Sequence, residues 1–371
     1  MWARMHGHWP VARSASPRST PFTIATRRRK VFVSTHVDDC MILGEHEYAR
    51  QATKAIKSMY TVRDNGFPDV FLGVEYKRTK EYIEICNTAM IDALMKRFRI
   101  ASKLVTSPMP ADTQLTAEDH SATRPDSTEY RQMVGSINFI AGRSRPDCAY
   151  IAHALARHLN APTHAHYNIA RRTIQYMHST RTLGIRYYAD HTHDLISYSD
   201  SDWAGCIDTR QSTSGRVHIM QGAAVMWATQ RQKSIALSSA EAEMVALSEA
   251  ARDVRFIRRF LKTIGQPLTN PTPVYEDNAS ALKWATSAAS PKWNATRHIA
   301  TRHFAVRVWR DAGIVDIRKV STHKQLADPF TKALPHAQLA ALRASVHGVR
   351  RADAPGYNPD LFTFNHAAAS A

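Results

Sequence analysis

The sequence has few cysteines and no long apolar run. Its 4 cysteines are far apart, and none belongs to a CxxC pair: Cys40, Cys86, Cys148 and Cys206. This spacing argues against a zinc site or a disulfide scaffold and favours a reducing compartment. No segment approaches the roughly 20 apolar residues that cross a bilayer, so we expect no membrane partner.

Acidic side chains are absent from residues 1–37, which contain several arginines. This composition is typical of an organellar transit peptide, and it also arises where a start codon lies inside a longer reading frame. The segment lacks an amphipathic helical period, so we favour the second interpretation. We predict an atypical basic N-terminus over 1–29, no convincing signal peptide, and a cytoplasmic or nuclear location.

Basic residues outnumber acidic residues in the chain as a whole. The 371 residues include 49 Lys+Arg and 32 Asp+Glu, a formal net charge of +17. Such a balance attracts polyanions, because each neutralised phosphate releases condensed counterions. We therefore expect a nucleic-acid partner. The length of the chain separately predicts two or three domains.

The first half of the chain predicts a short sheet followed by helices. Apolar residues at 31–33 and 41–43 flank a polar tip, which indicates a β-hairpin. A helix at 48–60 and strands at 71–76 and 82–85 follow. Residues 105–128 have the Pro, Ser and Thr content of a linker, and 129–180 are expected to be mostly helical. The outer face of these helices is predicted to be basic: Arg143, Arg145, Arg157, Arg171 and Arg172.

The second half predicts an α/β (mixed) fold with a five-stranded mixed sheet. Strands are expected at 196–200, 215–220, 224–229, 273–276 and 314–320. Helices are expected at 239–264, 279–287 and 297–311, with a last helix from 327. Three strands followed by alternating helices and strands are typical of a mixed sheet with helices on its faces.

Carboxylates stand at the ends of several of these elements. Asp200 and Asp277 each come at the end of an apolar strand, and Asp328 opens the predicted last helix. Ser238 and Glu241 form a capping box for the long helix, which leaves Glu243 without a structural role. From Glu243, steps of three and four residues give an apolar stripe: Leu247, Ala250, Val254, Ile257 and Leu261.

Glu243 therefore lies at the N-terminal end of the helix face that is predicted to be buried. An ionised carboxylate there is costly unless a partner compensates it, and no Lys or Arg shares its stripe. Hard oxygen ligands favour two Mg²⁺ or Mn²⁺ ions over Zn²⁺. Two such ions can activate a water and stabilise the leaving oxygen of a phosphodiester. We predict that Asp200, Glu243, Asp277 and Asp328 are both the metal ligands and the catalytic residues.

Four segments carry a resemblance to the ribonuclease H of copia-type LTR retrotransposon polyproteins. They lie at 197–205, 237–243, 275–278 and 326–332, with further similarity at 210–215 and 296–299. The resemblance implies cleavage of RNA in RNA–DNA hybrids. It makes His298 a candidate accessory residue, although Ala300 stands where the family has an acidic residue. Asp202 falls where other ribonucleases H carry a small residue, so we do not expect it to be a ligand.

The hairpin tip resembles the reverse transcriptase signature of the same polyproteins. It reads His36-Val37-Asp38-Asp39, with His36 where the family has Tyr, and similarity continues at 71–74, 130–136 and 144–147. The resemblance implies that Asp38 and Asp39 are polymerase metal ligands. The family draws another aspartate and the fingers from upstream sequence, and residues 1–35 contain no such motif, so we expect no independent polymerase activity.

The resemblance implies four parts after the basic N-terminus. These are a truncated reverse transcriptase palm (30–105), a helical thumb or connection region (106–190), a ribonuclease H-like domain (191–346) and a disordered tail (347–371). Expected partners are an RNA–DNA hybrid and other parts of the Pol polyprotein. The alternative is a catalytically inactive transposon remnant that binds nucleic acid, and it would show salt dependence of binding without metal dependence.

Overall fold

The computed structural model describes residues 22–25, 31–117, 123–190, 194–287 and 297–350. The expectations for residues 1–21 and 26–29, and for the tail from 351, lie outside the described residues. The predicted disordered tail begins at 347, and its first residues are instead packed in the fold: His347 is completely buried, with Nε2 3.1 Å from Asp147 Oδ1. Two compact units are distinguished. One comprises residues 1–68 with 255–269, and the other comprises 69–254 with 270–371. No helix in the described ranges combines the length and apolarity needed to span a membrane.

The first unit contains a three-stranded antiparallel sheet. Its order is β1 (Phe22–Ala25), β2 (Val31–His36) and β3 (Asp39–Gly44), and α1 (His46–Met59) follows. The predicted hairpin is confirmed as β2 and β3, with His36 opposite Asp39. Val31 and Val33 alternate with less buried residues along β2, as expected for a strand with one covered face.

A four-stranded antiparallel sheet belongs to the second unit. Its order is β4 (Val70–Phe71), β5 (Val74–Arg78), β6 (Tyr82–Cys86) and β7 (Ile185–Tyr188). The prediction of one continuous strand at 71–76 is wrong. Leu72 and Gly73 have φ values of 52° and 75°, so the chain turns there and β4 pairs back on β5.

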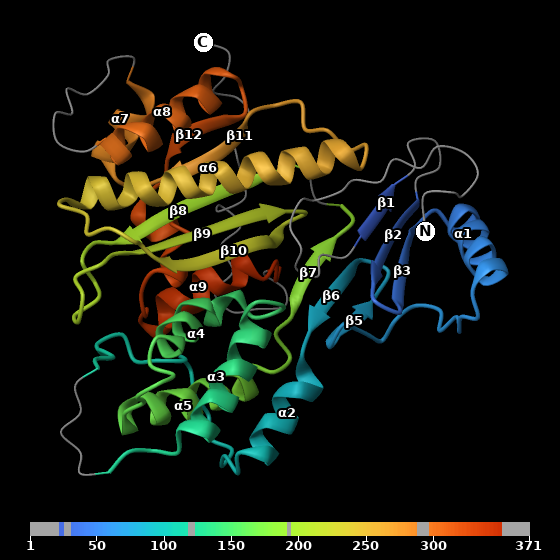
Figure 1. Ribbon diagram of the computed structural model, residues 1–371, viewed down its shortest axis with the longest axis horizontal. Helices are drawn as coiled ribbons and strands as arrows, with labels where there is room; N and C mark the ends of the chain where they lie inside the picture. Colours follow the sequence, from blue (N-terminus) through green and yellow to red (C-terminus); the bar gives the residue numbers. More distant parts are fainter. Residues whose placement is uncertain (1–21, 26–30, 118–122, 191–193, 288–296, 351–371) are drawn as a thin grey trace. The chain divides into compact units, whose positions relative to one another are not determined.

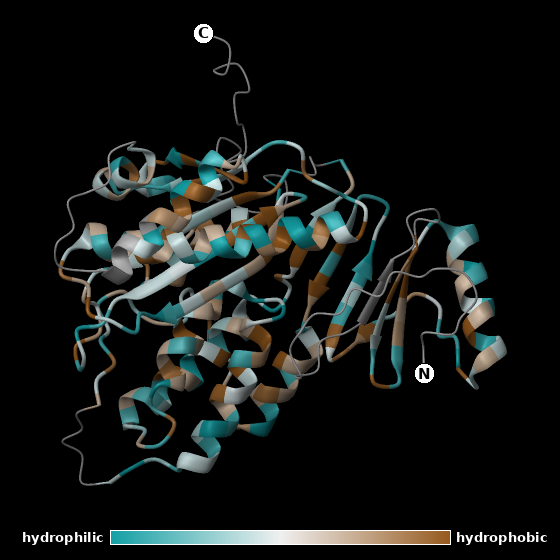
Figure 2. Cartoon of the chain, turned by 45° about the horizontal axis from the view of Figure 1, so that its top comes forward, coloured by the Kyte–Doolittle hydropathy of each residue, from teal (hydrophilic) through white to brown (hydrophobic). Residues whose placement is uncertain are grey.

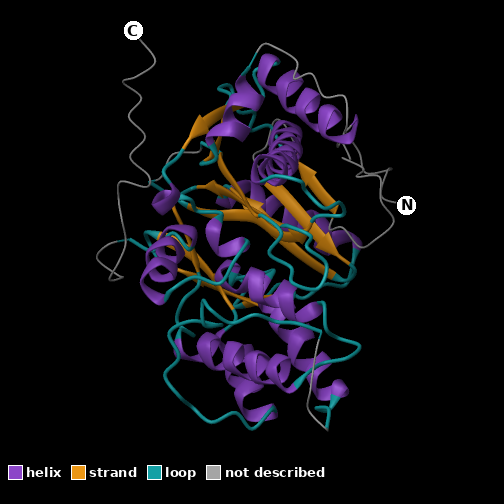
Figure 3. Ribbon diagram, turned by 90° about the vertical axis from the view of Figure 1, so that its left-hand side faces the viewer, coloured by secondary structure: helices purple, strands orange, loops and turns teal. Residues whose placement is uncertain are grey.

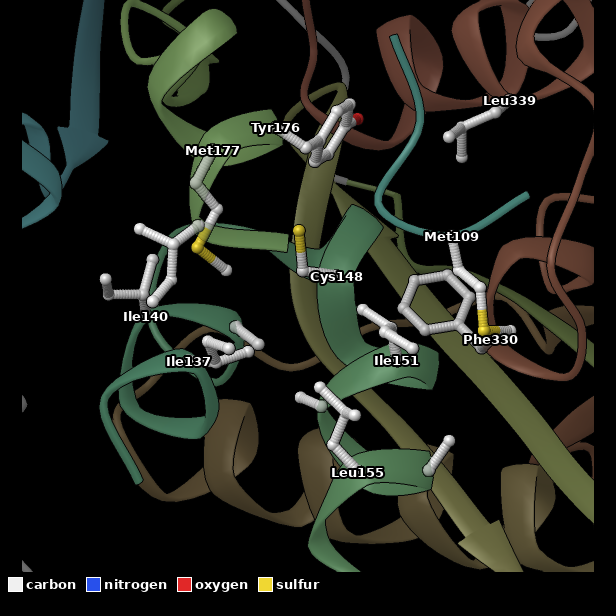
Figure 4. Packing of buried hydrophobic residues seen from close by; sticks show 14 of the residues in the cluster. Met109, Ile137, Ile140, Cys148, Ile151, Leu155, Tyr176, Met177, Phe330 and Leu339 are labelled. Atoms are coloured by element: carbon white, nitrogen blue, oxygen red, sulfur yellow. The ribbon is translucent and has the colours of Figure 1, made fainter. Parts of the chain in front are cut away.

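Several helices lie between β6 and β7 in the sequence. The first, α2 (Thr88–Arg97), was not predicted. The helical region predicted at 129–180 is confirmed, and it contains α3 (Ser127–Ala141), the short 3₁₀ helix η2 (Pro146–Cys148), α4 (Ala149–Ala156) and α5 (His164–Ser179). Figure 4 shows α4 side chains surrounded by apolar residues from α3, α5 and the chain's last segments. Brown and teal segments alternate along the helices in Figure 2, as expected for helices with one apolar and one polar face.

The second half forms the predicted five-stranded mixed sheet. Its order is β10 (Ala223–Arg231), β9 (Thr213–Met220), β8 (Ile196–Asp202), β11 (Thr272–Glu276) and β12 (Val315–Lys319). β8, β9 and β10 are antiparallel, whereas β11 is parallel to both β8 and β12. Helix α6 (Ser239–Thr263) crosses one face of this sheet, and α4 packs on the other (Figures 1 and 3).

The last segments differ from the prediction in one respect. Helices α7 (Ala279–Thr286) and α8 (Arg297–Asp311) occur as expected, but no helix runs on from 327. The short 3₁₀ helices η3 (Thr322–Lys324) and η4 (Asp328–Phe330) come first, and α9 (His336–Val346) begins after Pro335. Pro329 and Pro335 explain the break, because the residue before a proline is disfavoured in helical conformation.

Candidate metal centre

Asp200 lies inside β8, the central strand of the sheet. Its side chain is almost completely buried, and Thr331 Oγ1 donates a hydrogen bond to its carboxylate. Opposite Asp200 in the register is Gly215 of β9. A Cβ atom on Gly215 would lie 2.6 Å from Thr331 Cγ2 and 3.0 Å from the Ala327 carbonyl oxygen. The absent side chain therefore lets the segment 327–331 approach the sheet beside Asp200.

Glu243 lies in the first turns of α6 with only 6% of the residue exposed. The capping interaction predicted from the sequence is present, because Ser238 Oγ accepts a hydrogen bond from the Glu241 backbone N–H. Glu241 in turn accepts from the Leu237 N–H rather than from Ser238. Glu243 is thus left free of the cap, and its Oε2 has no hydrogen-bond partner among the described residues.

Asp277 follows β11 directly. Because β11 runs parallel to β8, with Val274 opposite Ser197, both strands end at the same edge of the sheet. One carboxylate oxygen each from Asp200, Glu243 and Asp277 lie within 4.8 Å of one another. Three of the four acids singled out in the sequence therefore converge, and this is the one group of potential metal ligands among the described residues.

Asp328 lies beside this group and is paired with a lysine. Its Oδ1 is 2.9 Å from Lys332 Nζ, and its Oδ2 accepts a hydrogen bond from Gln338 Nε2 at 3.1 Å. Lys332 Nζ also lies 3.9 Å from Asp200 Oδ2. The sequence reasoning missed Lys332, although its spacing of four residues from Asp328 was a visible signal.

Burial controls the protonation of these acids. It raises the pKa of Asp200 to about 7, while the Lys332 ammonium opposes the rise. Burial and the nearby Glu276 and Asp200 carboxylates hold the pKa of Glu243 well above its usual value. The pKa of Asp328 is raised by burial as well. Carboxylates in this state favour a bound cation, because a cation offsets both desolvation and mutual repulsion.

A fifth acid, Glu276, was also missed by the sequence reasoning. It is completely buried at the end of β11, where it accepts hydrogen bonds from Ser199 Oγ at 3.1 Å and the Asn278 N–H at 3.1 Å. Asp202 has a structural partner, since its carboxylate accepts a hydrogen bond from the Thr213 N–H. Sequence signals for Glu276 were weak because it directly precedes Asp277 on the same strand end.

The other predicted residues lie in different surroundings. Asp38 and Asp39 are both exposed at the turn of the hairpin. His298 lies in the first turn of α8, and its side chain is outside the described residues.

The predicted basic face of the central helices is wrong at Arg145. This side chain is fully buried and forms an ion pair with Asp147 at 2.8 Å. Arg171 donates to the backbone carbonyl of Phe98, so it too has a role within the fold. Arg143 remains exposed.

Comparison with protein-family models finds no match. The chain is 31% identical over 317 residues to the retrovirus-related Pol polyprotein from transposon RE2 of Arabidopsis thaliana, a match that covers 84% of this chain and 21% of that protein. It is 27% identical over 314 residues to the corresponding polyprotein from transposon TNT 1-94 of Nicotiana tabacum, covering 82% and 23%. Over most of its length the chain is therefore similar to transposon Pol polyproteins. It spans about a fifth of the length of these relatives.

Solved ribonuclease H structures align with part of this Pol-related chain. LC11-RNase H1 from compost aligns with a TM-score of 0.30 and 15% identity, covering 38% of this chain and 94% of that one. RNase H1 from Halobacterium salinarum aligns with a TM-score of 0.27 and 14% identity, covering 36% and 90%.

Proposed function

We propose that this chain is the ribonuclease H-type part of a copia-type Pol polyprotein and hydrolyses RNA in RNA–DNA hybrids. The observation that carries the proposal is the convergence of Asp200, Glu243 and Asp277 within 4.8 Å at one edge of the sheet. These acids come from three elements that are far apart in sequence, and two of them are buried. Without a compensating cation, such a grouping is unfavourable.

The donor set suits Mg²⁺ or Mn²⁺. All candidate ligands are carboxylate oxygens, which hard divalent cations prefer. Oε2 of Glu243 is a buried acceptor that receives no hydrogen bond from the part of the chain that the structure describes. Asp200, Glu243 and Asp277 would hold a first ion, and Asp328 would contribute to a second. When bound, the ions supply Lewis-acid activation of water and stabilisation of a leaving oxygen.

The chain's own residues position and neutralise the reacting groups. Thr331 fixes the Asp200 carboxylate, and Gly215 permits the close approach of the segment that bears Asp328. The net charge of +17 attracts the hybrid backbone, and exposed basic side chains such as Arg143 are suited to phosphate contacts. Recognition of this kind depends on the shape of the hybrid rather than on its sequence.

The test is cleavage of a labelled RNA–DNA hybrid by the purified chain in Mg²⁺. We expect cleavage of the RNA strand, no cleavage of duplex DNA, and loss of cleavage in Asp200→Asn and Glu243→Gln. Asp311→Asn is the matched control, because Asp311 is an exposed acid paired with its neighbour Arg310. A wild-type chain that binds hybrid with steep salt dependence but never cuts it would instead support the inactive remnant.

We also propose that the chain does not extend primers. Asp38 and Asp39 are exposed at a hairpin turn, and no further acid or histidine among the described residues joins them in a metal-binding group. Polymerisation by two metal ions needs ligands that enclose both ions. Primer extension by the purified chain that disappears in Asp38→Asn would overturn this proposal.

A further inference from the structure

Lys332 reaches from the protein surface into the acid cluster. Its side chain is 44% exposed, whereas its two partners Asp200 and Asp328 are only 5% and 1% exposed. The ammonium lies 2.9 Å from Asp328 Oδ1 and 3.9 Å from Asp200 Oδ2. One positive charge therefore lies against two buried carboxylates.

This contact divides the cluster into two halves. Asp200, Glu243 and Asp277 converge, and Asp328 stands outside that group. The Lys332 ammonium lies closer to Asp328 Oδ1, at 2.9 Å, than to Asp200 Oδ2, at 3.9 Å. A divalent ion and an ammonium group compete for the same carboxylate oxygen, because two cations that close to each other repel. The half that includes Asp328 is thus filled by a protein cation.

We propose that Lys332 is a positioning residue that occupies the place of the second divalent ion beside Asp328. The inference rests on the proposed function. Asp200, Glu243 and Asp277 would hold a first ion while Lys332 stays in place, and Asp328 would be available to a second ion only when the lysine side chain swings out to solvent. The partial exposure of Lys332 and its flexible stem permit this movement.

Mn²⁺ titration of the full chain, followed by electron paramagnetic resonance of free Mn²⁺, is expected to show one tight and one weak site. In Lys332→Met the second site becomes tighter by at least about tenfold, since a competing positive charge is lost. Lys332→Arg retains the weak second site. Lys103→Met, which removes a charge from an exposed lysine elsewhere, leaves both sites unchanged.

A second measurement examines the chain without divalent ions. In EDTA, Lys332→Met is expected to melt at a lower temperature than wild type, because Asp328 has lost its cation, and Mn²⁺ closes most of that gap. If Lys332→Met folds poorly, Lys332→Gln serves in both measurements, because it keeps a polar side chain.

These measurements distinguish failure of the Lys332 proposal from failure of the nuclease proposal. Equal second-site affinity in wild type and Lys332→Met overturns the lysine proposal and leaves the nuclease proposal intact. Weaker hybrid binding in EDTA with unchanged Mn²⁺ affinities would mean that Lys332 contacts substrate phosphate instead. A wild-type chain that binds no Mn²⁺ overturns the proposed function, and the lysine proposal with it.

Discussion

Two sets of aspartates and glutamates in this chain differ in how they come together. Asp38 and Asp39 are neighbours in sequence and lie exposed at a hairpin turn, where water solvates them. Asp200, Glu243 and Asp277 come from a strand, a helix and a strand end, and the fold brings them together with Asp200 and Glu243 buried and Asp277 half-buried. Two acidic residues that are adjacent in sequence are therefore weak support for a metal site. Buried acidic residues that the fold brings together from distant parts of the sequence are strong support.

Asp147 shows a second way to compensate a buried carboxylate, with protein cations in place of a metal ion. Asp147 is as buried as the cluster, yet the Arg145 guanidinium and His347 hold its pKa well below the usual range despite burial. Tyr176 Oη also donates to its carboxylate at 2.7 Å. The pKa of Asp147 is thus lowered by its cationic partners, whereas the pKa of Glu243, whose Oε2 has no hydrogen-bond partner among the described residues, is raised.

The largest expected effect is on the rate of hybrid cleavage, measured in one variant from each of the two acid sets. Asp200→Asn should lower hybrid cleavage in Mg²⁺ at least about a thousandfold, as expected for a group essential to a hydrolytic site. Asp38→Asn should leave the rate unchanged, because that carboxylate lies outside the cluster. Rates on one hybrid substrate measure both. A comparable loss in Asp38→Asn would end the distinction between the two sets.

The next effect concerns stability. Arg145→Met should destabilise the fold by about 3–5 kcal/mol, because it leaves the Asp147 carboxylate buried without its main cation. The double variant Arg145→Met with Asp147→Leu should recover part of this loss, since no unpaired charge remains. Urea unfolding measures the differences. Equal stability of Arg145→Met and wild type would show that Asp147 does not need its partner.

Much of the fold was predictable because its local signals agree. Alternating apolar residues and turn residues predicted the hairpin and the strands of the five-stranded sheet, and the Ser238 cap predicted the start of α6. The stripe from Glu243 is buried as predicted, with Leu247, Ala250 and Val254 completely enclosed. These features depend on neighbours in sequence, which a pattern can capture.

What the sequence did not predict depends on distant partners. Arg145 was placed on a solvated face because its burial requires Asp147 and the helix α5, which a helical pattern does not include. Lys332 and Glu276 were overlooked because their roles follow from proximity to Asp200 across the sheet. The positive φ of Leu72, which divides the strand predicted at 71–76, has no counterpart in strand propensity.

Ion binding gives the third effect. Mn²⁺ at about 100 times its dissociation constant should stabilise the wild-type chain by about 2.7 kcal/mol. In Glu243→Gln the stabilisation should fall, because the buried ligand has lost its charge, and in Asp38→Asn it should be unchanged. Thermal melting with and without Mn²⁺ measures this. Loss of the stabilisation in Asp38→Asn alone would place the ion at the hairpin instead.

Gly215→Ala should have a smaller effect, about 1–3 kcal/mol of destabilisation, typical of overpacking. The added methyl would lie 2.6 Å from Thr331 Cγ2 and 2.8 Å from Phe330 Cβ, so the segment beside Asp200 must move. Hybrid cleavage should fall with stability. Gly135→Ala is the matched control, since a Cβ there meets nothing within 4 Å. If both variants behave alike, the close approach at Gly215 does not position the site.

The smallest expected effect is the pH dependence of stability that comes from the buried histidine His153. Burial, helped by the Arg157 and Arg231 cations, lowers the pKa of His153 to about 4, and its Nε2 has no hydrogen-bond partner among the described residues. The unfolded chain, with an ordinary histidine pKa near 6.5, binds more protons below that pH, so stability falls as pH drops from about 6.5 towards 4. Between pH 7 and 5 the wild-type chain should therefore lose about 1–2 kcal/mol more than His153→Leu. Urea unfolding at both pH values, with the exposed His46→Gln as control, measures the difference. Parallel losses in wild type and His153→Leu would show that burial does not control this histidine as it controls the acid cluster.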